Sequence, residues 1–507
     1  MEHDLSKFSK IKNKAWTIFG LSYLTFLIWN IVTTGWLYGS LNPDGTHSLA
    51  AVLIPVLANS LLYSCVFILY HHYKRIQGTY WGLVFFVAIW MGFEKLHLNW
   101  EFTWPWLNLG NAFSEYPKLI QWYDTLGATG GSFWILLLNV FGFYTLRIWQ
   151  AERKQKPLIV NVSILVAGIL LPMGISLLQY NSFDQKPSGE VSVLLLQPDL
   201  NPYTEKYSKD SLTILSELLQ LAQSHSTGKI DYYIAPETSL PGYGSISETG
   251  FKDSYVLGQV KEFLKTKPGG VFAAGISSHR FFSPMETAPK NAYQTAGGLF
   301  VESYNTAVQL DPRSEIQIYH KGKLVPGVEI FPYMGLLKPI LGDAMLNFGG
   351  AVASLGVDDK RAVFTNPYNE GKLAPIICYE SIYGEFTTEY VKNGANFLAI
   401  MTNDSWWGVS NGHKQLLSYA RLRAIENRRE IARSANSGIS AHIDARGEIL
   451  SDTFYGDQTA LFAKVNLYEN QTFYTKTGDL LTRISIFVLG FLIFYTLIKK
   501  IQNRKKA

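Results

Sequence analysis

The feature that most limits how this chain can fold is a series of long apolar runs in its first 185 residues. Runs close to the ~20 residues that span the hydrocarbon core of a bilayer lie at about 14–38, 48–70, 79–98, 131–149 and 158–180, and another lies at 481–499. These runs predict six membrane-spanning helices. The first is long and lacks a small-residue cleavage site, so we expect a retained helix rather than a cleaved signal peptide.

Lysine and arginine residues predict how these helices are oriented. They gather before the first run, after the second, between the fourth and fifth, and at the C-terminus, whereas the intervening loops carry almost none. Because Lys and Arg are enriched in cytoplasmic loops, we expect both termini in the cytoplasm and the segment between the last two runs outside it. Topology therefore explains the net charge of +5 better than nucleic-acid binding does. The basic tail at 499–506 is typical of a contact with lipid head groups.

Three parts are expected along the chain: residues 1–185 with about five transmembrane helices, an outside catalytic domain at 186–475, and residues 476–507 with a last transmembrane helix and a basic cytoplasmic tail. Helical periodicity in the middle part indicates helices at 211–224 and 413–433, and turn residues at 311–314 and 444–447 mark hairpins. Strands are expected at 191–195, 232–236, 271–276, 306–310, 316–320, 374–378, 397–402, 439–443 and 460–465. This mixed order predicts an α/β domain in which helices cover buried sheets.

Three of the expected strands end on a chemically useful side chain: Glu237 after 232–236, Lys321 after 316–320, and Cys378 after 373–377. A cysteine thiolate acts as a nucleophile when a base and a cation lie nearby, so these residues predict a Glu–Lys–Cys active site. A lone cysteine is more often a small buried hydrophobe, and Glu or Lys at a strand end is usually only solvated, so the residues alone leave both interpretations open. The other cysteine, Cys65, lies in an apolar run, and no intramolecular disulfide is expected.

Five short motifs in chain order resemble those of the nitrilase superfamily: APET at 235–238, YNTA at 304–307, YHKGKLVP at 319–326, ICYE at 377–380 and TNDSWWG at 402–408. Together with the apolar runs on both sides, they resemble the apolipoprotein N-acyltransferase family, and FTWPWLNLG at 102–110 is similar to that family's aromatic loop. The resemblance implies a membrane α-helical bundle plus a nitrilase-like α-β-β-α sandwich outside the membrane. The family typically has seven helices before this domain, where the present sequence has five.

The resemblance also implies an activity: transfer of an acyl chain from a phospholipid to the N-terminal α-amine of a diacylglyceryl-cysteine apolipoprotein, during lipoprotein maturation at the bacterial inner membrane. Cys378 would carry the acyl chain as a thioester. Lys321 would favour its thiolate, and Glu237 would accept and return the proton. The domain would then face the periplasm, where it meets phospholipid and lipoprotein.

Four further residues match family positions tied to activity: Glu329, Tyr379, Glu380 and Trp406. Glu329 or Glu380 is expected to orient Lys321, a backbone N–H near Tyr379 to stabilise an oxyanion, and Trp406 to wall the acyl pocket. The histidines show no metal-ligand spacing and no phosphate-binding loop is present. We therefore expect no metal and no cofactor.

Two other functions stay open at this point. A membrane-tethered nitrilase-type amidase would use the same three residues but admit water to the thioester. A transporter with an inert outer domain is disfavoured because the spans lack paired charges, apart from Glu94 and Lys95 near a helix end. The apolar segment 329–350 is expected either to be core or to form an arm that dips into the membrane.

Overall fold

The computed structural model of the chain describes residues 14–42, 45–205, 209–240, 245–283, 288–289, 291–313, 315–336 and 354–506. Most of the expected apolar arm, at 337–350, lies outside these residues. The chain forms two compact units. A helical unit contains Met1–Tyr38, Ser48–Gln179 and Asp479–Ala507, and an α/β unit contains Gly39–His47 and Tyr180–Gly478.

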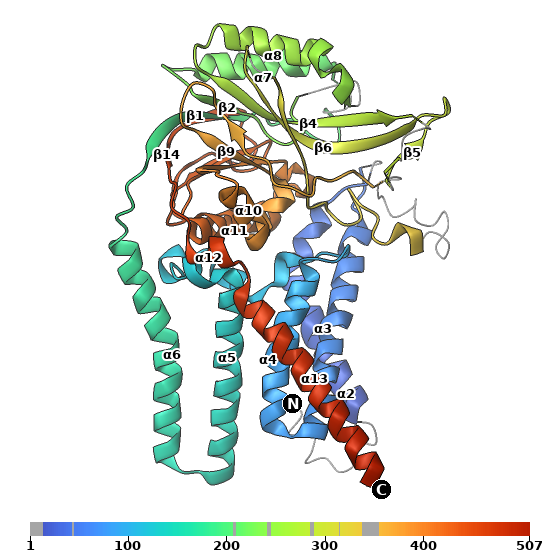
Figure 1. The fold of residues 1–507 in the computed structure, drawn as a ribbon, viewed down its shortest axis with the longest axis vertical. Coiled ribbons are helices and arrows are strands. Elements are labelled where there is room, and N and C mark those ends of the chain that lie inside the picture. Colours follow the sequence, from blue (N-terminus) through green and yellow to red (C-terminus); the bar gives the residue numbers. More distant parts are fainter. Residues whose placement is uncertain are drawn as a thin grey trace. The chain divides into compact units, whose positions relative to one another are not determined.

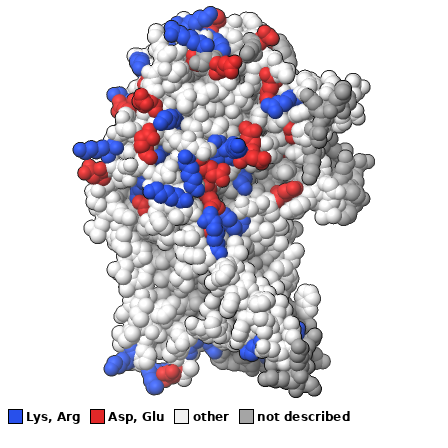
Figure 2. Space-filling view, viewed as in Figure 1, with Lys and Arg blue, Asp and Glu red and all other residues white. Residues whose placement is uncertain are grey.

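The helical unit contains a helix at each expected apolar run: α2 (Lys14–Thr34), α3 (Leu49–Gln77), α4 (Thr79–His97), α5 (Tyr123–Glu152), α6 (Gln155–Asn181) and α13 (Leu480–Lys506) (Figure 1). In the described part of the chain, five helical stretches are long and apolar enough to cross a membrane: Lys14–Gly39, Leu49–Gln77, Tyr123–Glu152, Gln155–Asn181 and Leu480–Gln502. The helix α4 is not among these five. Figure 2 shows a surface almost without charge along these helices, with Lys and Arg gathered near one end. The chain is a membrane protein.

Aromatic packing holds α2, α3 and α4 together. Tyr63 is fully buried, and its ring centroid lies 5.1 Å from that of Phe26 and 5.3 Å from that of Trp90. At one end of α4, Lys95 forms an ion pair of 2.8 Å with Asp479, which directly precedes α13. This ion pair joins the end of α4 to the start of α13.

The first sheet of the α/β unit has the strand order β14-β1-β2-β4-β6-β5, with β3 beside β4 and β7 beside β6. Its strands β1, β2 and β4 are parallel, whereas β14, β6 and β7 run antiparallel to their partners. The bounds are β1 (Gly189–Gln197), β2 (Tyr232–Ile234), β3 (Ile246–Ser247), β4 (Val271–Phe282), β5 (Tyr293–Gln294), β6 (Phe300–Leu310), β7 (Gln317–His320) and β14 (Thr459–Leu467).

The second sheet has the order β13-β12-β11-β10-β9-β8, and its central strands β9, β10 and β11 are parallel. The bounds are β8 (Phe364–Thr365), β9 (Lys372–Ile377), β10 (Phe397–Thr402), β11 (Ile431–Ala435), β12 (Ala441–Ile443) and β13 (Ile449–Asp452). All nine expected strands are therefore present. Both expected hairpins are confirmed, because β6 and β7 pair antiparallel, as do β12 and β13.

Helices cover the outer faces of the two sheets. The helices α7 (Ser211–His225) and α8 (Tyr255–Lys265) bury Leu218 and Val260 against Leu194 and Phe272 of the first sheet. The helices α10 (Gly384–Lys392) and α11 (Asn411–Asn427) lie on the side of the second sheet (Figure 1). Between the sheets, the Ser434 hydroxyl donates a hydrogen bond of 2.8 Å to the Leu196 carbonyl. The expected α-β-β-α sandwich is confirmed.

One expected element is wrong. The helix expected over 413–433 ends at Asn427, because Arg428 adopts a left-handed conformation with φ +49°. The chain then enters β11, which is buried along its whole length. Ala432 continues the helical spacing of apolar residues, but alanine also fits a buried strand. The sequence pattern therefore did not indicate where the helix ends.

Candidate active site

The three residues expected to form the site follow strand ends in the α/β unit. Glu237 lies three residues after β2, Lys321 directly after β7, and Cys378 directly after β9. Active sites of α/β folds form where the carboxyl ends of strands meet. The structure brings these three residues together, since the charges of Glu237 and Lys321 both act on the Cys378 thiol.

Cys378 has an unusual backbone conformation. It begins the short 3₁₀ helix η7 (Cys378–Ile382) with φ +48°, in the left-handed region that non-glycine residues rarely adopt. Thr238, next to Glu237, also has φ +48°. Such conformations cost about 1–3 kcal/mol and collect at functional sites, where the surrounding structure enforces them. The turn from β9 into η7 holds the cysteine at the sheet edge.

Lys321 lies between two carboxylates and its side chain is 1% exposed. Its Nζ is 2.8 Å from Glu237 Oε1 and 2.9 Å from Glu329 Oε1. Burial lowers the pKa of Lys321, but the charges of Glu237 and Glu329 outweigh this effect and raise it well above its usual value. Lys321 is therefore a fixed cation, and Glu329 orients it directly.

Asn305 joins the same cluster and was not among the expected site residues. Its Nδ2 donates to Glu237 Oε1 at 2.7 Å and to Glu329 Oε1 at 2.8 Å, so one amide holds both carboxylates. Its backbone carbonyl accepts from the Lys321 N–H at 2.8 Å. Asn305 could have been identified from its amide side chain, because an amide that is buried in a strand needs hydrogen-bond partners.

The surroundings of Cys378 favour the neutral form of its thiol. Burial raises its pKa, the charge of Glu237 raises it further, and the opposing effect of Lys321 does not compensate. Lys321 does lower the pKa of the thiol, as expected of an adjacent cation, but burial and the charge of Glu237 outweigh it. The sulfur must lose its proton during attack, which requires a base at the site.

Glu380 connects the two loops that carry Cys378 and Lys321. Its Oε1 accepts from Gly322 N and from the Tyr319 hydroxyl, both at 2.6 Å. Its Oε2 accepts from Ile377 N at 2.7 Å and from the Tyr390 hydroxyl at 3.3 Å. Since Gly322 follows Lys321 and Ile377 precedes Cys378, Glu380 acts on both residues through their neighbours rather than by direct contact.

The other two expected residues pack against aromatic neighbours. Tyr379 is buried, and its ring packs edge-on against Tyr383 at 5.3 Å. Trp406 lies in η8 (Asp404–Trp407), where its ring meets that of Tyr203 at 5.4 Å and its carbonyl accepts from the Tyr203 hydroxyl at 2.9 Å. Trp406 is thus anchored to the segment that follows β1.

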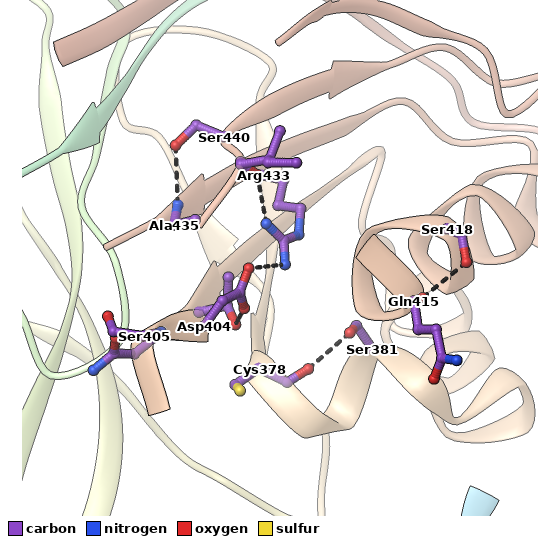
Figure 3. A network of polar contacts seen from close by, with 12 residues as sticks. Cys378, Ser381, Asp404, Ser405, Gln415, Ser418, Arg433, Ala435 and Ser440 are labelled. Atoms are coloured by element: carbon purple, nitrogen blue, oxygen red, sulfur yellow. Dashed lines mark hydrogen bonds and ion pairs between the residues drawn. The ribbon is translucent and has the colours of Figure 1, made fainter. Parts of the chain in front are cut away.

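Figure 3 shows a buried ion pair near Cys378. Asp404 Oδ2 is 2.8 Å from Arg433 Nη2, and both side chains are fully buried. Asp404 follows β10 and Arg433 lies within β11, so the pair ties two neighbouring strands together beside the site. In the described part of the chain, no group of three or more His, Cys, Asp or Glu residues is arranged to hold a metal ion.

Two family models match the chain. Residues 7–141 match the apolipoprotein N-acyltransferase N-terminal domain. Residues 195–472, more than half of the chain, match the carbon-nitrogen hydrolase domain.

Curated relatives match both parts together. The chain is similar to an apolipoprotein N-acyltransferase of Chlorobaculum tepidum, at 28% identity over 95% of this chain and 88% of the relative. It is also similar to one of Haemophilus influenzae, at 27% identity over 88% of this chain and 80% of the relative. Among solved structures, a Saccharomyces cerevisiae member of the nitrilase superfamily matches 56% of this chain and 92% of its own, at 16% identity and a TM-score of 0.39. The chain belongs to the carbon-nitrogen hydrolase family and joins that domain to the N-terminal domain of apolipoprotein N-acyltransferases.

Proposed function

We propose that this chain transfers an acyl group from a phospholipid to the N-terminal α-amine of a diacylglyceryl-cysteine lipoprotein, through a thioester on Cys378. One observation carries the proposal: a single chain joins apolar helices that match the acyltransferase N-terminal domain to an α/β unit with a buried Glu–Lys–Cys cluster. The curated relatives that match most of the chain are named for the same activity.

The first half-reaction forms the acyl-enzyme. Glu237 accepts the thiol proton while the Cys378 sulfur attacks the ester carbonyl carbon of the phospholipid. The Lys321 ammonium stabilises the negative charge that develops on the carbonyl oxygen, and loss of such a donor typically costs ~2.7–4 kcal/mol. The C–O bond then breaks, and Glu237 returns the proton to the departing lysophospholipid.

The second half-reaction releases the acyl chain to the amine. Glu237 takes a proton from the α-amine of the lipoprotein as the nitrogen attacks the thioester carbon. The C–S bond breaks, the sulfur regains a proton, and the acyl chain remains on the nitrogen as an amide. Two substrates that use one site in turn give ping-pong kinetics.

The basic residues near the ends of the helices support a periplasmic location for this chemistry. Basic residues before α2 and in the C-terminal part of α13 favour cytoplasmic termini. An odd number of crossings before residue 186 then delivers the catalytic domain at 186–475 to the periplasm, and residues 476–507 return the chain through the inner membrane to its cytoplasmic tail. There the domain meets the outer leaflet, which supplies phospholipid.

The test is mass spectrometry of a lipoprotein N-terminus from cells with and without this chain. The proposal expects an N-acylated cysteine only when the chain is present. An N-terminus that is acylated equally in both cells would contradict it. Free fatty acid release that is fast and unaffected by a diacylglyceryl peptide would instead identify a membrane-tethered amidase.

A further inference from the structure

Thr402 is a fully buried residue beside Cys378 that the chemistry above does not use. In the parallel pair of β9 and β10, Ile377 lies opposite Met401, so the next residues along the two strands are Cys378 and Thr402. Thr402 lowers the pKa of the Cys378 thiol, as a hydrogen-bond donor to sulfur does, against the effects of burial and Glu237. Strand register therefore places a hydroxyl next to the nucleophile.

The same hydroxyl has a second partner. Thr402 Oγ1 donates to Asp404 Oδ1 at 2.8 Å. A hydroxyl carries a single proton and two lone pairs. While it donates to Asp404, Thr402 can only accept a hydrogen bond from the Cys378 S–H group, which suits a neutral thiol and not a thiolate.

Asp404 is held without help from Thr402. Its Oδ2 accepts a hydrogen bond of 2.8 Å from Arg433 Nη2 (Figure 3). Arg433 Nη1 in turn donates to the Ile439 carbonyl at 2.5 Å. Gly438 also lies directly against Asp404 Oδ2, where any side chain would collide. The carboxylate therefore stays in place when the Thr402 proton turns away from it.

We propose that the Thr402 hydroxyl is a hydrogen-bond switch that donates to Asp404 when Cys378 is a thiol and to the sulfur when Cys378 carries negative charge. In the acyl transfer proposed above, on which this inference rests, the switch acts twice. It stabilises the sulfur as its proton leaves for Glu237, and again when the C–S bond breaks and the electron pair returns to sulfur. Thr402 itself gains and loses no proton in either step.

Alkylation of Cys378 by iodoacetamide tests the switch without any lipid substrate. The full chain in detergent is treated across neutral to alkaline pH, and peptide mass spectrometry follows Cys378 separately from Cys65. The charged groups that face the sulfur, Glu237, Lys321 and Asp404, are unchanged in every variant, as are Arg433 and His413 beside Asp404.

The matched variants differ in the hydroxyl. Thr402→Ser keeps it, and we expect the native pH profile. Thr402→Val and Thr402→Ala remove it, and we expect profiles displaced to higher pH with alkylation about tenfold slower at neutral pH, as for the loss of a hydrogen bond to a charged group. Thermal melting shows whether each variant folds. If only one of the two hydroxyl-free variants folds, its pH profile is sufficient to decide the result.

Native profiles in the hydroxyl-free variants would overturn the inference. So would an equal slowing in Thr402→Ser, because the lost methyl group and not the hydroxyl would then be responsible. If instead the switch behaves as expected but the native chain transfers no acyl group to a lipoprotein amine, the proposed function fails and the switch stands as a property of the cysteine site.

Discussion

Glu380 offers a sharp test of how the site is held together, through the substitution Glu380→Gln. The carboxylate accepts from two backbone N–H groups, Gly322 N and Ile377 N, and from two tyrosine hydroxyls. In glutamine one of the two oxygens becomes an NH₂ group, so one backbone N–H must face another donor. The tyrosine hydroxyl beside it can rotate and accept instead.

The cost follows from these contacts. One buried N–H without a partner costs about 1–3 kcal/mol, and the remaining bonds lose the strength that a charged acceptor gives. We expect a loss of roughly 2–4 kcal/mol. At about 2–4 °C per kcal/mol for a domain of this size class, the melting temperature should fall by roughly 5–15 °C.

The assay combines thermal unfolding in detergent with the rate of acyl-enzyme formation, which should also fall because Glu380 positions the neighbours of Cys378 and Lys321. Glu262→Gln is the matched control, since Glu262 on α8 and its ion-pair partner Lys265 are both more than half exposed and the change should cost little. A Glu380→Gln protein that melts within about 2 °C of the native chain and forms acyl-enzyme normally would refute this reasoning.

Three further outcomes follow from the same geometry. Lys321→Arg should abolish acyl-enzyme formation measured by mass spectrometry, because a planar guanidinium does not fit a site made for one compact ammonium between two carboxylates; normal labelling would contradict this. Gly275→Ala should lower both stability and activity, since its Cβ would lie 2.6 Å from Glu237 Cα, whereas Gly258→Ala on α8 meets nothing within 4 Å and should be tolerated or slightly stabilising. Burial raises the pKa of Cys378 above that of an exposed thiol, so the stability due to its neutral form is complete below about pH 8.5 and is lost as the pH rises towards the folded-state pKa. Cys378→Ser should remove this part of the loss of stability at alkaline pH. Identical curves of stability against pH for the native chain and the variant would contradict this.

Strand ends were the strongest information in the sequence. Apolar runs that stop at Glu237, Lys321 and Cys378 located the three residues correctly at the edges of two sheets, because strand length and the polar residue that ends it are local properties. The helix expected to run through Arg433 failed for a non-local reason. A charged residue inside a buried strand is stable only because Asp404, 29 residues away, neutralises it.

The electrostatics of the site needed the structure. Sequence order identifies Lys321 as a cation near Cys378, but it does not reveal that Glu237 and Glu329 share this cation or that burial dominates the pKa of the thiol. Asn305 and Thr402 were present in recognised motifs, yet their roles depend on which atoms they meet across strands. Register within a sheet sets those contacts, and it is not a local property of the chain.

The most direct test of the account asks whether Cys378 carries the acyl chain between two substrates. The purified chain is incubated with phospholipid labelled in its acyl chain, analysed by peptide mass spectrometry, and then given a diacylglyceryl-cysteine peptide. The account predicts label on Cys378 that persists without the peptide and moves to the peptide's α-amine when it is added. Label that reaches the amine in the Cys378→Ser protein would contradict the account.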